Sequence, residues 1–103
     1  MDMWAQLVKM RLKPGKDMTR MNEQIKAAEQ PGSGLVRTLI MRDQKDPGQV
    51  YVLVVFDSEE QARARERDPQ REERLKPARE TMADVLDGSP EFVDLSVVEE
   101  WTG

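Results

Sequence analysis

The chain has 103 residues, with 16 basic and 20 acidic side chains, no histidine and no cysteine. The lack of cysteine excludes disulfides, thiolate nucleophiles and thiolate metal sites. The lack of histidine excludes imidazole metal ligands, an axial histidine on haem and histidine-based acid–base catalysis. The length fits one domain over residues 1–103, with a single core.

Charge and hydropathy bear on the location and the partners of the chain. The net charge is −4, which argues against binding to nucleic acid or to a membrane surface. The longest apolar run, residues 50–56, is too short to span a bilayer. The first residues lack the basic and then apolar pattern of a signal peptide. We therefore expect a cytoplasmic domain.

The N-terminal half of the chain predicts a strand, a helix and a hairpin. Residues 4–12 alternate as a strand does. In residues 17–30, apolar side chains recur at spacings of three, four and three and form one helical stripe: Met18, Met21, Ile25 and Ala28. Residues 35–42 and 50–56 are two apolar strands, and the turn Asp46-Pro47-Gly48 between them predicts a hairpin.

The C-terminal half predicts two helices and a strand. Ser58 followed by Gln61 is a capping box that begins the second helix, and Asp68-Pro69 begins the third. Pro77 should kink the third helix or split it in two. Residues 92–101 predict the last strand. The order β-α-β-β-α-(α)-β is the ferredoxin-like α+β fold, with a four-stranded antiparallel sheet.

Both faces of the predicted sheet are apolar, although helices cover only one face in this topology. In residues 50–56 the side chains of Val50, Val52, Val54 and Phe56 point one way, and those of Tyr51, Leu53 and Val55 point the other. An uncovered apolar face of this size is unusual for a monomer. We expect a homodimer in which two sheets pack face to face. The alternative is that the third helix or a terminus covers part of that face.

The sequence resembles the dimeric α+β barrel superfamily, and specifically the antibiotic biosynthesis monooxygenase (ABM) domains. The resemblance is carried by the strand 50–56, the helix start Asp57-Ser58-Glu59-Glu60-Gln61-Ala62, Asp68-Pro69 and the valine-rich last strand. It implies a ferredoxin-like protomer, a homodimer with back-to-back sheets, and a pocket between helices and sheet. Some members oxygenate quinol-like or polyketide substrates without metal or flavin, some degrade haem, and many have no known activity.

Two positions depart from the pattern of this family. Its strand-to-helix junction usually carries a tryptophan, where this chain has Phe56, and its helical histidine falls at about Arg65. Haem-degrading members need a histidine ligand, so the resemblance does not extend to haem chemistry.

The candidate site follows from what oxygenation without a cofactor requires, which is an apolar site that stabilises a substrate anion. Tyr51 and Asn22 are the candidate catalytic residues, because each can donate a hydrogen bond to an oxyanion. The candidate residues for substrate binding are Trp4, Phe56, Met21, Met82 and Trp101. We expect no metal and no cofactor. The competing interpretation is structural: strand aromatics and methionines fill cores or interfaces, and an asparagine on a helix is usually solvated.

Three functions are compatible with these observations. The first is a cofactor-independent monooxygenase that acts on a hydrophobic aromatic or quinol-like substrate. The second is a non-catalytic dimeric module that binds a small hydrophobic ligand or serves a structural role. The third is an isomerase or cyclase with a carboxylate base. A cavity that holds Tyr51, Trp4 or Asn22 favours an enzyme, whereas a space filled by methionine and leucine favours the module.

Overall fold

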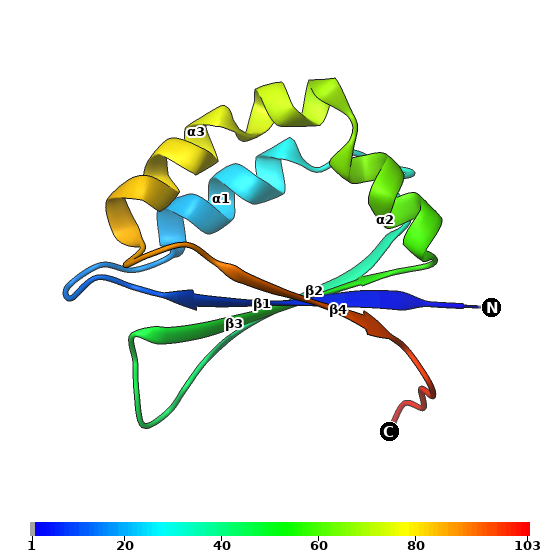
Figure 1. The fold of residues 1–103 in the computed structure, drawn as a ribbon, viewed down its shortest axis with the longest axis horizontal. Coiled ribbons are helices and arrows are strands. Elements are labelled where there is room, and N and C mark those ends of the chain that lie inside the picture. Colours follow the sequence, from blue (N-terminus) through cyan, green and yellow to red (C-terminus); the bar gives the residue numbers. More distant parts are fainter. Residues whose placement is uncertain (1) are drawn as a thin grey trace.

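The computed structural model describes residues 2–103 and confirms the ferredoxin-like α+β fold. Its elements are β1 (Trp4–Arg11), α1 (Thr19–Ala28), β2 (Leu35–Arg42), β3 (Gln49–Phe56), α2 (Glu59–Glu66), α3 (Pro69–Val85) and β4 (Glu91–Ser96). The antiparallel strands lie in the order β2-β3-β1-β4. All three helices cover one face of this sheet, and the other face carries no helix (Figure 1). Within residues 2–103, no helix is both long and apolar enough to cross a membrane.

The predicted helix starts are confirmed by their capping hydrogen bonds. The Ser58 hydroxyl accepts a hydrogen bond from the backbone N–H of Gln61 at 3.2 Å, at the start of α2. The Asp68 carboxylate accepts one from the backbone N–H of Gln70 at 3.0 Å, at the start of α3. Each cap satisfies a backbone donor that the first helical turn leaves free.

Two sequence-based expectations need correction. Of the two outcomes expected at Pro77, the split does not occur, because α3 runs without interruption from Pro69 to Val85. The last strand ends at Ser96 and not at Trp101. Ser96 pairs with Trp4, the first residue of β1, so the residues beyond Ser96 have no partner strand to extend the ladder.

A bulge in β2 changes which side chains face the helices. Leu35 pairs with Phe56 and Arg37 pairs with Val55, so Val36 is the extra residue. Strict alternation would place Leu35 on the same face as Leu39. Instead, Leu35 packs on the helix side with the cluster around Phe56.

The core lies between the helices and one face of the sheet. The predicted stripe of α1 faces it, with Met21 completely buried, Met18 and Ala28 buried, and Ile25 packed against them. A separate cluster joins Ala28 of α1 to Leu75 and Ala78 of α3. The two long helices therefore share one small contact surface above the sheet, and the space beneath that contact is only partly filled.

Candidate ligand-binding cavity

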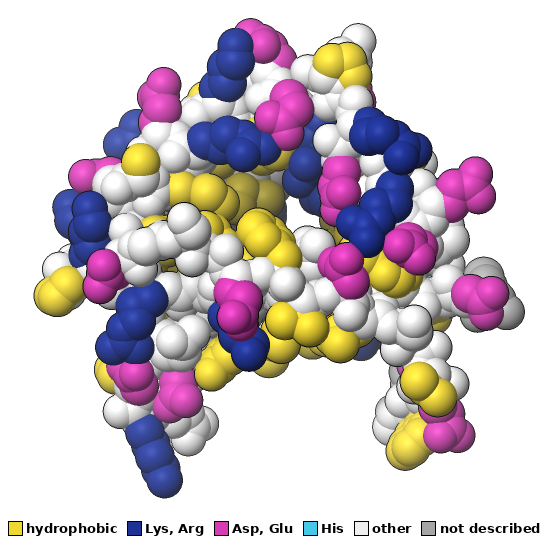
Figure 2. Space-filling view, in the orientation of Figure 1, with side chains coloured by type: hydrophobic (Ala, Val, Ile, Leu, Met, Phe, Trp, Pro, Cys, Tyr) yellow, Lys and Arg dark blue, Asp and Glu magenta, His cyan; other side chains and the backbone are white. Residues whose placement is uncertain are grey.

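A cavity of about 390 Å³ lies between the helices and the sheet. The space-filling view shows hydrophobic side chains around this hollow and Lys and Arg side chains near its rim (Figure 2). Its apolar wall comes from all four strands, α1 and α3, and consists of Val8, Met10, Met18, Ile25, Leu35, Ile40, Val52, Val54, Met82, Pro90 and Phe92. Its polar wall consists of Gln6, Asn22, Lys26, Glu29, Thr38, Arg65 and Arg71. We call this the helix-side cavity.

A second cavity of about 510 Å³ adjoins the first beneath α2 and α3. The two share wall residues from the strands and from the helices, namely Gln6, Val54, Arg65, Arg71, Met82 and Phe92. Trp4 and Phe56 close the far end of the second cavity, with their ring centroids 6.1 Å apart. The two cavities together therefore extend from α1 to the aromatic pair under α2, and the wall of the second cavity is both apolar and charged.

An ion pair between α1 and α2 forms part of the wall. Arg65 Nε donates hydrogen bonds to both carboxylate oxygens of Glu29 at 3.1 Å, and the Ser33 hydroxyl donates another to Oε1 at 2.8 Å. Burial alone raises the pKa of Glu29, but the hydrogen bonds from Arg65 and Ser33 outweigh burial and hold that pKa below its usual value. Glu29 is therefore ionised near neutral pH and neutralises Arg65.

Arg71, in the first turns of α3, has no such partner. It is half-buried, its Nε is shielded from solvent without a hydrogen-bond acceptor, and no ion pair within residues 2–103 includes it. Burial and the neighbouring Arg65 lower the pKa of Arg71 from its usual value. An arginine remains charged despite such a shift, so the wall carries a positive charge that no carboxylate hydrogen-bonds.

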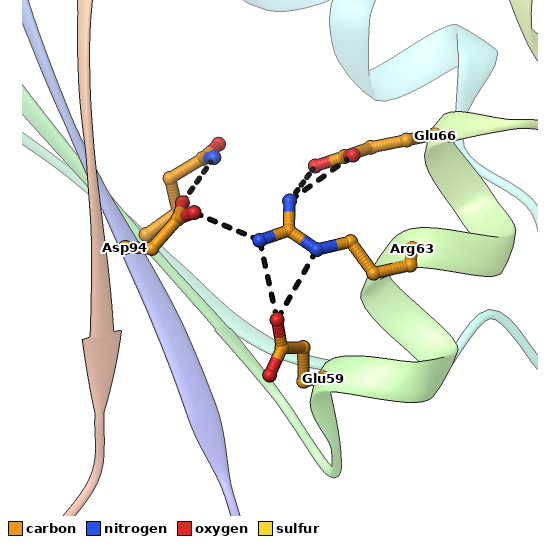
Figure 3. Close-up of polar contacts among 5 residues, drawn as sticks. Glu59, Arg63, Glu66 and Asp94 are labelled. Carbon is orange, nitrogen blue, oxygen red and sulfur yellow. Dashed lines mark hydrogen bonds and ion pairs between the residues drawn. The ribbon is translucent and has the colours of Figure 1, made fainter.

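A network around Arg63 closes the end of the second cavity (Figure 3). Arg63 lies over the Trp4 ring at 4.9 Å and bonds to Asp94 of β4 at 2.8 Å. Glu59 and Glu66 accept further hydrogen bonds from Arg63 within α2. The bonds from Arg63 and then from Gln6 lower the pKa of Asp94. This network connects α2 to the edge strand and covers the Trp4 ring.

The structure brings four of the seven sequence-predicted site residues to these cavities. Asn22 lines the helix-side cavity, Trp4 and Phe56 line the second cavity, and Met82 lines both. They come from α1, β1, β3 and α3. The predicted pocket between helices and sheet is therefore present, with Asn22 as the predicted oxyanion donor on its wall.

The other three predicted residues do not line either cavity. Tyr51 pairs with Lys9 and Met41 on the face of the sheet away from the helices, because side chains alternate along β3. Met21 is completely buried in the core and has no surface left for a ligand. Trp101 is 79% exposed in the segment after β4.

Sequence reasoning missed the charged part of the wall, Glu29, Arg65 and Arg71. These residues lie in a densely charged stretch and at the end of a helix, where most charged side chains are solvated. The one signal was the position of Arg65, where the ABM pattern has a histidine. Among residues 2–103, no group of three or more acidic side chains is arranged to hold a metal ion.

Solved structures of the same fold were found by structural comparison. A protein from Caulobacter crescentus, provisionally named an antibiotic biosynthesis monooxygenase, superposes with a TM-score of 0.74 at 19% identity, over 95% of this chain and 92% of its own. A similarly named protein from Chloroflexus aurantiacus gives 0.71 at 20% identity, over 97% of each chain. SnoaB from Streptomyces nogalater, a cofactor-independent oxygenase, gives 0.72 at 11% identity, also over 97% of each chain.

These matches confirm the predicted ABM-like fold. No family model and no curated protein matches the sequence. Because the identities are low, the likeness establishes the fold and leaves the activity to be argued from the cavity.

Proposed function

We propose that this protein is a cofactor-independent oxygenase whose substrate is an electron-rich hydroxy-aromatic, held in the helix-side cavity. The observation that carries the proposal is the cavity itself, which is mostly apolar on the strand side and is lined by Asn22 and an unpaired Arg71 on the helix side. The fold likeness to SnoaB supports the same class of reaction.

The proposed reaction needs no group beyond the substrate and dioxygen. A quinol-like or anthrone-like substrate loses a proton, and its anion passes electrons to dioxygen. For an anthrone, the methylene carbon gains a carbonyl oxygen, and the second oxygen atom leaves as water. The contribution of the protein is to stabilise the anion by hydrogen bonds and positive charge in a site with little water.

Two carboxylates at these cavities, Glu29 and Asp94, are poor proton acceptors. Burial raises the pKa of Glu29, but the hydrogen bonds from Arg65 and Ser33 outweigh it and leave that pKa below its usual value. Hydrogen bonds from Arg63 and Gln6 lower the pKa of Asp94. A general base works best when its pKa lies near the operating pH. We therefore expect a substrate that is acidic by itself, whose ionisation is favoured by Arg71.

Oxygen uptake with a panel of quinols and anthrones tests the proposal. Wild type is expected to consume oxygen with at least one member, and Asn22→Ala to lower that rate about 10- to 100-fold through the loss of an oxyanion donor. Tyr51→Phe is the matched control, because Tyr51 lies on the other face of the sheet. Absence of uptake across the panel, or equal rates for wild type and Asn22→Ala, would contradict the proposal.

One observation favours the second candidate function, a non-catalytic binding module. In the described chain neither cavity is lined by a tyrosine or a histidine. The carboxylates of Glu29 and Asp94, which line the cavities, both have a lowered pKa. A module would bind the same aromatic ligands and leave them unchanged under air. Binding without oxygen uptake is therefore the result that distinguishes it.

We also propose that the protein is a homodimer that packs through the helix-free face of the sheet. Leu39, Met41 and Leu95 are each about two-fifths exposed on this face, beside half-buried Leu53 and Val55. The β2–β3 turn and the C-terminal segment both extend on this side (Figure 1). Together they frame an apolar surface that a second sheet fits.

A further inference from the structure

Arg65 and Arg71 lie where three cavities meet. Both line the helix-side cavity, the second cavity under α2, and an outer cavity of about 340 Å³ beside the loop after α1. The outer cavity is bounded by Glu29, Ser33 and the α2–α3 junction. The two guanidinium groups therefore lie between the apolar helix-side cavity and an outer cavity lined mostly by polar residues.

Only one of these two guanidinium groups has a carboxylate partner. Arg65 is held by Glu29, and Glu72, the acidic residue next to Arg71, pairs instead with Arg79 at 2.6 Å. Arg71 donates no side-chain hydrogen bond in the described chain, and its Nε is buried. A half-buried charge without a partner is costly, and a bound anion would remove that cost.

The charge of the cavity wall is opposite to that of the whole chain. The wall of the helix-side cavity carries Lys26, Arg65 and Arg71 against Glu29 alone, whereas the chain has a net charge of −4. Three cations against one carboxylate leave an excess of positive charge beside an apolar surface. This combination suits a ligand that is aromatic at one end and anionic at the other.

We infer that the ligand of the helix-side cavity is an aromatic carboxylate, with its ring against Val52, Val54 and Met82 and its carboxylate paired with Arg71. That the ligand is aromatic rests on the proposed function. The new element of the inference is that the ligand also carries a permanent negative charge. A carboxylate is favoured because a planar guanidinium matches its two oxygens, and because an aromatic carboxylate is ionised at neutral pH.

Calorimetric titration at neutral pH with two ligands of equal size tests this inference. The probes are 2-naphthoate and the neutral 2-naphthalenemethanol. Wild type is expected to bind the carboxylate about tenfold or more tightly. Arg71→Gln should reduce this preference to about twofold or less, while binding of the alcohol stays nearly unchanged. Arg67→Gln removes one charge from an exposed side chain nearby and should keep the wild-type preference.

The outcomes separate this inference from the proposed oxygenase. Equal binding of both probes by wild type, or an unchanged preference in Arg71→Gln, would overturn the carboxylate assignment. If Arg71→Gln unfolds, as judged by circular dichroism, Arg71→Lys is used instead, and its preference should lie between those of wild type and a neutral side chain. Carboxylate binding without oxygen uptake sustains the inference and counts against the oxygenase. Oxygen uptake with neutral quinols that falls in Arg71→Gln, together with equal binding of both probes by wild type, supports the oxygenase and overturns the carboxylate assignment.

Discussion

At the scale of single residues, the same three charged side chains govern both stability and the proposed binding. Glu29 and Arg65 form a mostly buried pair with three hydrogen bonds between them. The negative charge of Glu29 offsets part of the repulsion between Arg65 and Arg71. Removing the carboxylate would leave two like charges in partly buried positions.

The Glu29–Arg65 pair predicts a pH-dependent contribution to stability. Glu29→Gln should lower the free energy of unfolding by about 1–2 kcal/mol at neutral pH. Because the folded state holds the pKa of Glu29 below its usual value of 4.5, this stabilisation is complete above that value and is lost as the pH falls through the lower, folded-state pKa. Urea unfolding of wild type and variant from pH 7 to pH 3 measures the difference. A difference in the free energy of unfolding that stays constant down to pH 3 would contradict the prediction.

Met21 was a candidate binding residue, and its burial predicts a role in stability instead. Met21→Ala should lower the free energy of unfolding by about 2–4 kcal/mol, because it leaves a void in a core with no exposed surface at that side chain. Val98→Ala, at a side chain that is 94% exposed, is the control and should change little. Affinity for an aromatic ligand should be unchanged in folded Met21→Ala protein. A loss of affinity for the ligand without a loss of stability would contradict this prediction and would indicate that Met21 contacts the ligand.

At the scale of elements, α3 continues through a proline that would interrupt an isolated helix. The helix has Pro77 in its interior, yet it runs unbroken above the cavity. Pro77 is exposed on this helix, whereas Leu75 and Ala78 are buried against the rest of the structure. Tertiary packing of these residues is the physical reason that the helix continues through the proline.

The cap of α3 predicts a measurable loss when Asp68 is changed. Asp68→Ala should lower the free energy of unfolding by about 1 kcal/mol, because the backbone N–H of Gln70 loses its acceptor. Asp68→Asn keeps an acceptor oxygen and should retain most of the stability. Chemical denaturation of the two variants in parallel gives the comparison. Equal losses in both variants would show that the charge of Asp68, and not its capping bond, is what matters.

At the scale of the whole molecule, the two faces of the sheet differ in what covers them. One face is covered by three helices and holds the cavities, and the other carries exposed Leu39, Met41 and Leu95 (Figure 1). The third helix does not reach the second face, which removes one of the two alternatives to a dimer. The proposed dimer would bury this face and would place Tyr51 in the interface.

The proposed dimer predicts a change of mass on introducing one charge. Sedimentation of the wild-type protein should give twice the chain mass of 11.9 kDa at micromolar concentration. Leu39→Asp should shift the protein to the single-chain mass, because a charge in an apolar interface is costly. Ala83→Asp adds the same charge to the exposed surface of α3 and should leave the mass unchanged. A folded wild-type monomer would contradict the proposal.

Much of the fold follows from local sequence signals. Ser58, Asp68 and the turn Asp46-Pro47-Gly48 each act through bonds to near neighbours, so their roles can be read from a few residues. The apolar stripe of α1 is likewise a local pattern of residue spacing, and its side chains pack into the core. Local signals fail where a distant partner decides, as at Ser96, where β4 ends because β1 begins at its partner Trp4.

The candidate site was only partly predictable for the same reason. The sequence by itself determined the α+β order of elements and the two apolar faces of the sheet, and it proposed seven pocket residues, of which Asn22, Trp4, Phe56 and Met82 line the cavities. Only the tertiary structure decided that Tyr51 faces away and that Arg65 and Arg71, from two different helices, meet over an apolar cavity. Pairing and burial of charges depend on which distant side chains come together, and no local pattern records that.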